Sequence, residues 1–125
     1  MSLPDIQNRN DLLMLVSTFY QDVRKDEILK DKFMQVVWET HIPVMVDFWD
    51  NVIFYNGNYN GNPMLKHLLV NSITPLTEAH FSRWLSLNDN VVDRLFSGPN
   101  ATMLKEKAHN IAHFLQNKVI KKSGE

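Results

Sequence analysis

The chain contains no cysteine in its 125 residues. Disulfides, thiolate zinc sites, iron–sulfur clusters and cysteine nucleophiles are therefore excluded, and the absence fits a reducing compartment. Glycine is also scarce, with four residues in all. These glycines form neither a P-loop nor a dinucleotide-binding fingerprint, so no nucleotide-binding motif is present.

An excess of charge of one sign is lacking too. Thirteen Lys and Arg residues are balanced by fourteen Asp and Glu residues, for a net charge of −1. That balance argues against binding to the phosphate backbone of nucleic acid. No stretch approaches the roughly 18 apolar residues of a membrane span, and the N-terminus has no signal-peptide pattern. We expect a soluble, cytoplasmic protein that binds neither nucleic acid nor a membrane.

The composition is that of a globular protein, with 44% hydrophobic residues. Its length corresponds to one domain, and we assign residues 1–125 to a single unit with a polar tail from about residue 119. No convincing period-2 run is present, whereas apolar residues recur at helical spacing. The chain therefore reads as all-α.

Gly, Pro and Asn residues divide the chain into five predicted helices. Asn8 or Asn10 can cap the first helix, and Pro43 is expected in the first turn of the second. Asn62-Pro63 and Thr74-Pro75 repeat the pattern of a cap followed by proline. The predicted ranges are 10–25, 40–54, 63–70, 75–96 and 101–119.

Two histidines one turn apart, His109 and His113, have a spacing that can bind a metal ion. Glu106 is nearby, but no His-Glu-x-x-His pattern is present, so two solvated histidines are the favoured interpretation. No Glu-x-x-His pair recurs on two helices, and a di-iron carboxylate bundle is therefore unsupported.

Four residues on different predicted helices together suit a flat, apolar, iron-bearing cofactor. His67 lies in the short helix, and His41 begins the apolar face of another. Tyr20 and Trp84 lie on the inner faces of the first helix and the long fourth helix. Such a cofactor needs one imidazole ligand, apolar walls and a few polar groups near the open iron position.

Four segments resemble group III truncated haemoglobins, in the order and spacing of that family. The resemblance covers about residues 4–118, nearly the whole chain. The segments are 19–26 (FYQDVRKD), 38–49 (WETHIPVMVDFW), 59–67 (YNGNPMLKH) and 80–85 (HFSRWL).

The resemblance implies a two-over-two helical sandwich around haem b, which is held without covalent attachment. It implies that His67 is the proximal iron ligand and that Tyr20, His41 and Trp84 are distal residues. Met45 then lies at the apolar side of the pocket, one turn after His41. The residues that this resemblance assigns to the haem cage and core are Phe19, Phe33, Phe48 and Trp49.

Two cations are candidates for the haem propionates, because Lys66 precedes His67 and Arg83 precedes Trp84. The alternative is a pair of solvated surface charges. The chain departs from the family pattern at Asn88, where an aromatic residue is usual, and at Lys30-Asp31, which replace a common Gly-Pro.

The distal residues suggest a function. Tyr20 and Trp84 each offer a hydrogen-bond donor to a small ligand such as dioxygen or nitric oxide. Two donors slow ligand release, which favours redox chemistry over transport, for instance nitric oxide dioxygenase or peroxidase-like activity with a reductase partner. The main alternative is a haem-free helical interaction module on a globin scaffold.

Overall fold

Four α-helices and a short 3-10 helix form the regular structure in the part of the chain that the computed structural model describes, residues 3–33, 37–55 and 77–123. No strand occurs in those ranges, which confirms the all-α prediction. The predicted short helix 63–70 lies outside them. The elements are α1 (Arg9–Lys25), η1 (Lys30–Phe33), α2 (Trp38–Phe54), α4 (Glu78–Leu95) and α5 (Pro99–Ser123).

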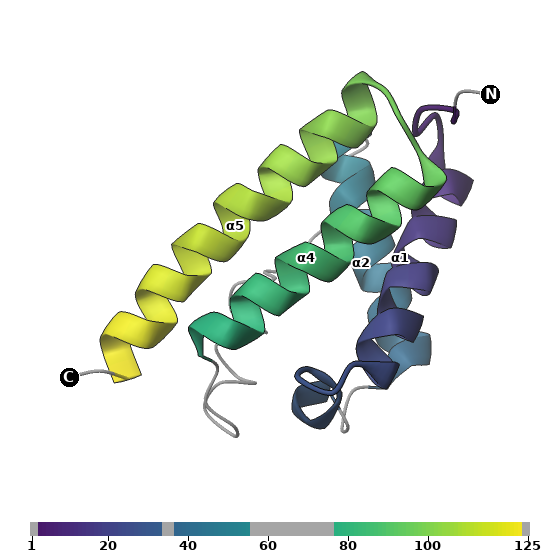
Figure 1. Cartoon of the computed structure of the whole chain (residues 1–125). Helices are drawn as coiled ribbons and strands as arrows, with labels where there is room; N and C mark the ends of the chain where they lie inside the picture. Colours follow the sequence, from purple (N-terminus) through teal and green to yellow (C-terminus); the bar gives the residue numbers. More distant parts are fainter. Residues whose placement is uncertain (1–2, 34–36, 56–76, 124–125) are drawn as a thin grey trace.

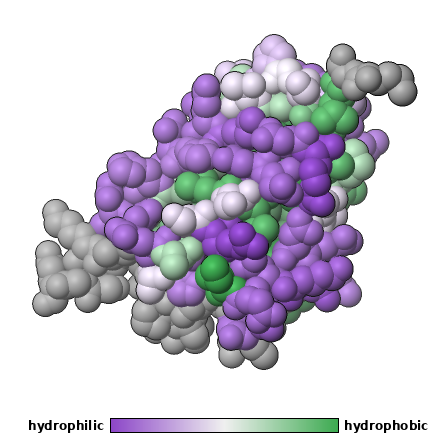
Figure 2. All heavy atoms as spheres, viewed as in Figure 1, coloured by the Kyte–Doolittle hydropathy of each residue, from purple (hydrophilic) through white to green (hydrophobic). Residues whose placement is uncertain are grey.

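The helices form two packed pairs. α1 packs against α2, α4 packs against α5, and α1 also packs against α4 (Figure 1). This is the two-over-two arrangement that the sequence resemblance implies. Hydrophilic residues cover most of the face in Figure 2, with hydrophobic residues along a central seam. Within the described ranges, no helix combines the length and apolar character that crossing a bilayer requires.

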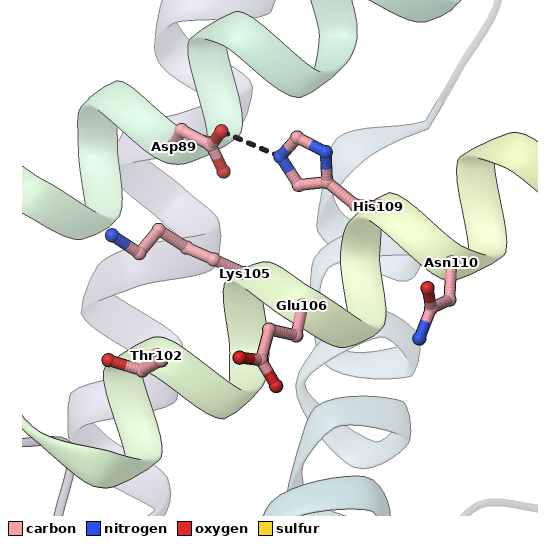
Figure 3. A pocket seen from close by; sticks show the side chains of 6 residues that line it. All are labelled: Asp89, Thr102, Lys105, Glu106, His109 and Asn110. Atoms are coloured by element: carbon pink, nitrogen blue, oxygen red, sulfur yellow. Dashed lines mark hydrogen bonds and ion pairs between the residues drawn. The ribbon is translucent and has the colours of Figure 1, made fainter.

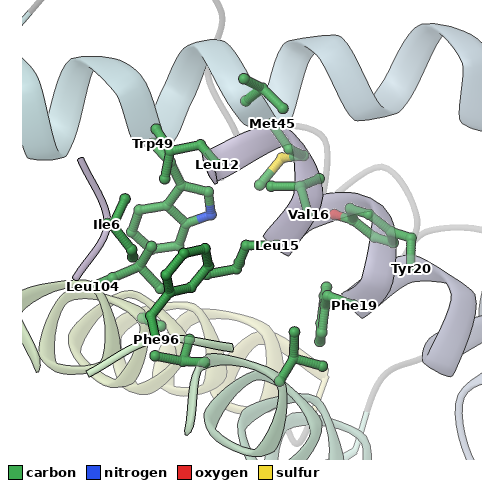
Figure 4. Packing of buried hydrophobic residues seen from close by; sticks show 14 of the residues in the cluster. Ile6, Leu12, Leu15, Val16, Phe19, Tyr20, Met45, Trp49, Phe96 and Leu104 are labelled. Atoms are coloured by element: carbon green, nitrogen blue, oxygen red, sulfur yellow. The ribbon is translucent and has the colours of Figure 1, made fainter. Parts of the chain in front are cut away.

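Apolar side chains of all four helices meet in one core, together with Ile6 before α1, Leu29 after α1 and Phe96 after α4. Trp49 of α2 lies in this core with Ile6, Leu12 and Phe96, as Figure 4 shows. Each such side chain contributes about 1.5–3 kcal/mol when it is fully buried. The inner face of α1 supplies Leu12, Leu15, Val16, Phe19, Tyr20 and Val23.

The first helix is capped as one of the two predicted residues requires. Asn8 Oδ1 accepts the backbone N–H of Asp11 at 3.0 Å, so Asn8 rather than Asn10 is the cap. Arg24 and Lys25 lie in the last turn, where positive charge opposes the helix dipole favourably. Asp26 then ends the helix.

The second helix begins two residues before the predicted start, and the prediction for Pro43 was wrong. The backbone N–H groups of Thr40 and His41 both donate to the carbonyl of Val37, so Trp38 opens α2 and Pro43 lies in its second turn. A proline there removes one hydrogen bond of the helix. The ring of Trp38 packs on that of Tyr20 with centroids 4.4 Å apart, a tertiary contact that favours the extra turn.

The start of α4 is held by the side chain of His80. Thr77 is the N-cap of α4, and its backbone N–H donates to Nδ1 of His80 at 2.9 Å. His80 is therefore part of the helix cap. Asn88, at the middle of the helix, is 2% exposed, so the core continues through this polar position.

The N-terminal segment holds the first turn of α5. Asp5 accepts the backbone N–H groups of Asn100 at 3.0 Å and Ala101 at 2.9 Å, and Asn100 Nδ2 donates to the carbonyl of Ile6 at 2.7 Å. Burial by itself raises the pKa of Asp5. Hydrogen bonds from three backbone N–H groups outweigh this effect, so that the net pKa lies below its usual value. The carboxylate is thus kept charged at a helix N-terminus.

We predict that Gly98→Ala destabilises the fold. Gly98 has φ of +146°, and a Cβ there would lie 2.5 Å from Cγ of Asp5. The strained backbone and the displaced Asp5 should together lower the free energy of unfolding by about 1–3 kcal/mol. Urea denaturation measures the change, with the exposed neighbour Ser97→Ala as control. Equal midpoints for the two variants would show that Asp5 moves without cost.

Candidate functional site

Aromatic rings from three helices meet beside the buried hydroxyl of Tyr20. The rings of Tyr20 and Trp38 have centroids 4.4 Å apart, and His41 lies 5.0 Å from Tyr20. Phe19 contacts Tyr20 at 5.1 Å and Trp84 at 5.5 Å, in both cases edge to face. These five residues, Phe19, Tyr20, Trp38, His41 and Trp84, are called the distal cluster below.

His41 points into this cluster. Its Nε2 lies 2.9 Å from Oη of Tyr20, which is hydrogen-bond distance. Tyr20 is 3% exposed, whereas His41 is half-buried. This contact orients His41 toward Tyr20. α1 and α2 are joined by a polar contact within apolar surroundings.

The hydroxyl of Tyr20 is held in its neutral form. Burial raises the pKa of Tyr20, because the phenolate would lose its hydration. A neutral phenol has one proton to donate and lone pairs to accept with. Tyr20 can therefore act as a hydrogen-bond donor over the ordinary pH range.

Of the other predicted pocket residues that the structure places, two are buried in the core and two are half-buried. Met45 is 6% exposed and Trp49 is 3% exposed, and both belong to the main core. Phe48 is half-buried and lies 4.9 Å from the ring of Trp49. Trp84 is also half-buried and meets the cluster through Phe19. The structure thus brings Tyr20, His41, Phe19 and Trp84 together.

Three predicted residues cannot be placed in this geometry. His67 and Lys66 lie outside the described residues, and so does the side chain of Phe33. Their roles as proximal ligand, propionate partner and cage residue stay predictions.

Arg83 has a partner that the sequence reading did not anticipate. Its Nε donates to Oδ1 of Asp26 at 2.6 Å, and the Asp26 side chain is 5% exposed. A haem propionate would therefore have to bind Arg83 through the Nη nitrogens. In the sequence, Asp26 stands directly after a predicted helix and ends the resemblance segment 19–26, but neither feature predicts its pairing with Arg83. Trp38 begins the resemblance segment 38–49, but nothing in the sequence predicts the contact of its ring with Tyr20.

The two spaced histidines of α5 are exposed. His109 Nε2 lies 2.7 Å from Oδ2 of Asp89 across a shallow polar groove between α4 and α5, as Figure 3 shows. Nε2 of His113 lies 3.3 Å from the side-chain amide of Asn117. In the part of the chain that is described, no group of three His, Cys, Asp or Glu residues could hold a metal ion. The interpretation as solvated histidines is consistent with this placement.

One known protein and one solved structure are similar to this chain over nearly its whole length. It is 28% identical over 123 residues to the group 3 truncated hemoglobin ctb of Campylobacter jejuni, with 94% of each chain covered. Its fold matches the crystal structure of a group III truncated hemoglobin from Campylobacter jejuni with a TM-score of 0.83. That match has 26% sequence identity and covers 95% of each chain. No family model matches the sequence.

These comparisons confirm the resemblance that the four sequence segments suggested. Likeness in sequence and likeness in fold both extend over nearly the whole chain and point to the same group. The fold is that of a truncated globin, and the protein is globin-like.

We predict that Tyr20 makes stability fall at alkaline pH. Its pKa is raised in the folded state, so its contribution is fully present below the unfolded pKa of about 10 and is lost as pH rises above that value. Tyr20→Phe should therefore lose less stability than the parent between about pH 8 and pH 11.

Urea denaturation at the two pH values measures this difference. Tyr55→Phe is the matched control, because Tyr55 is 82% exposed and should leave the pH dependence unchanged. A parent-like slope in Tyr20→Phe would contradict the assignment.

Proposed function

We propose that this protein binds haem b without covalent attachment and takes a small diatomic ligand, such as dioxygen or nitric oxide, on the side of the distal cluster. The observation that carries this proposal is the buried Tyr20 hydroxyl at hydrogen-bond distance from His41 among aromatic rings. Similarity to group III truncated hemoglobins supports it, because the same residues stand at the distal positions of that resemblance.

The described side chains fit such a cofactor. A haem needs an apolar cage with few polar groups, and the cluster provides four aromatic rings, one imidazole and one hydroxyl. Met45 adds an apolar side chain one turn after His41. If bound there, haem would supply an iron that can take a diatomic ligand. We assign the protein ligand of the iron to His67.

The hydroxyl of Tyr20 has one proton, which it can donate either to Nε2 of His41 or to a ligand in the pocket. When Nε2 of His41 carries no proton, the Tyr20 hydroxyl donates to it. When Nε2 carries the proton, the imidazole donates to Oη, and the hydroxyl proton is available for a ligand. His41 thus controls whether Tyr20 can donate to a molecule in the pocket.

Trp84 supplies a second donor of a different kind. Its indole N–H has a fixed direction, and its ring excludes water from the space beside Phe19. Each net hydrogen bond contributes about 1–1.5 kcal/mol, so that one donor slows release of a ligand about tenfold and two donors slow it further. Slow release suits chemistry on the ligand better than transport. We infer conversion of nitric oxide or peroxide, with a reductase that returns ferric iron to ferrous.

We predict that His67→Ala abolishes stable haem binding, because it removes the assigned protein ligand of the iron. Titration of the purified chain with haem, followed by the Soret absorption band, measures retention after gel filtration. His113→Ala is the matched control, since this histidine is exposed on α5. Normal retention in His67→Ala would refute the ligand assignment, and a parent chain without a Soret band would favour the haem-free interaction module.

We also predict that Tyr20→Phe speeds ligand release. The substitution keeps the ring and removes one donor, so the dissociation rate of dioxygen should rise about tenfold. Trp84→Phe should act in the same direction. Stopped-flow measurements on both variants and on His41→Leu, for which a smaller effect is expected, separate the three roles. Unchanged rates in Tyr20→Phe and Trp84→Phe with a sharp rise in His41→Leu would make histidine the donor.

A further inference from the structure

We propose that the ion pair between Arg83 and the buried carboxylate of Asp26 positions Trp84 against the distal cluster and thereby sets how fast a distal ligand leaves. The inference rests on the proposed function and adds two positioning residues to it. Neither residue belongs to the distal cluster itself.

Asp26 is fixed by three hydrogen bonds. Oδ1 accepts Nε of Arg83 at 2.6 Å, and Oδ2 accepts the backbone N–H groups of Ile28 and Leu29 at 3.1 Å each. Burial by itself raises the pKa of Asp26. The hydrogen bonds from Arg83 and the two amides outweigh this effect, so that the net pKa lies below its usual value. The carboxylate is therefore charged and cannot rotate without breaking a bond to a charged group or to the backbone.

The pair joins the two helices that carry the proposed donors. Asp26 ends α1, which bears Tyr20, and Arg83 directly precedes Trp84 in α4. Neighbouring residues of a helix point about 100° apart. Arg83 contacts Asp26 and Trp84 contacts Phe19, so the two contacts together fix the rotation of α4 about its axis. A slide of α4 along α1 would also break the 2.6 Å contact.

A second ion pair between the same helices provides a natural comparison. Arg94 Nη2 lies 2.8 Å from Oδ2 of Asp22, but these side chains are 51% and 31% exposed. Exposed pairs contribute little, because water replaces either partner at small cost. The Arg83 side chain is 41% exposed, but the Asp26 side chain is only 5% exposed. Loss of Arg83 would leave this buried carboxylate with only two amides. The Asp26 pair is therefore the stronger constraint on α4.

The test compares ligand release in haem-loaded variants. Arg83→Gln removes the charged partner, and Asp26→Asn removes the carboxylate charge while keeping an amide oxygen for the backbone. Each should raise the dissociation rate of dioxygen about tenfold, as loss of one net hydrogen bond from Trp84 would. Each should also shift the stretching frequency of bound carbon monoxide, which reports on donors near the ligand. Arg83→Lys should recover part of both, and Arg94→Gln should change neither.

A double-mutant cycle shows whether the pair acts through Trp84. In a Trp84→Phe background, Asp26→Asn should have little further effect, because the group that it positions is gone. An equal effect in both backgrounds, or parent-like rates in Asp26→Asn, would overturn the proposal. Asp26→Asn also separates this role from binding of a propionate by Arg83, since it leaves the guanidinium in place.

Two controls keep the outcomes distinct. Urea denaturation of the haem-free variants checks folding, and if Arg83→Gln fails to fold, the comparison of Asp26→Asn with Arg83→Lys decides. A parent protein that shows no Soret band would remove the proposed function. If the parent binds haem and Tyr20→Phe has the expected effect, but Asp26→Asn has none, only this inference is contradicted.

Discussion

Burial of the Tyr20 hydroxyl is the constraint on which the distal side of the fold depends. A hydroxyl removed from water needs a partner, or it costs about 1–3 kcal/mol. His41 of α2 is at hydrogen-bond distance, and Trp38 covers the ring from the same turn. The first turn of α2 must therefore form in front of Pro43, even though the proline removes a hydrogen bond from the helix interior. One polar contact thus sets where α2 begins and which way its histidine points.

Three buried or half-buried carboxylates likewise join helices to segments that are distant in the sequence. Asp5 holds the start of α5, and Asp26 ties the end of α1 to α4. Asp50, 2% exposed in α2, pairs with Arg9 at the start of α1. Each of these groups joins segments that are remote in sequence, whereas the apolar core is shared by all of them. The core stabilises the helices collectively, and the carboxylates determine how far one helix can slide against the next.

Helical periodicity predicted the described elements well, because each helix buries one face. It could not predict Trp38 as the start of α2, since that choice depends on Tyr20 in another helix. The Asp26–Arg83 pair was missed for the same reason, as nothing local marks a carboxylate for burial by a distant cation. For the candidate site, local patterns together with the resemblance selected Tyr20, His41 and Trp84. The structure brings them into one cluster, while His67 stays a prediction from sequence.

The middle of α4 explains why its end contacts matter. Asn88 is 2% exposed at a position where the resemblance leads one to expect an aromatic ring, and within the described structure its amide nitrogen has no hydrogen-bond partner. Such a buried group costs about 1–3 kcal/mol and supplies less apolar contact than a ring would. The helix centre is thus held less strongly at this position than an aromatic ring would hold it. The position of α4 relative to α1 then depends more on the contact of Arg83 with the buried Asp26 carboxylate near the start of α4, next to Trp84.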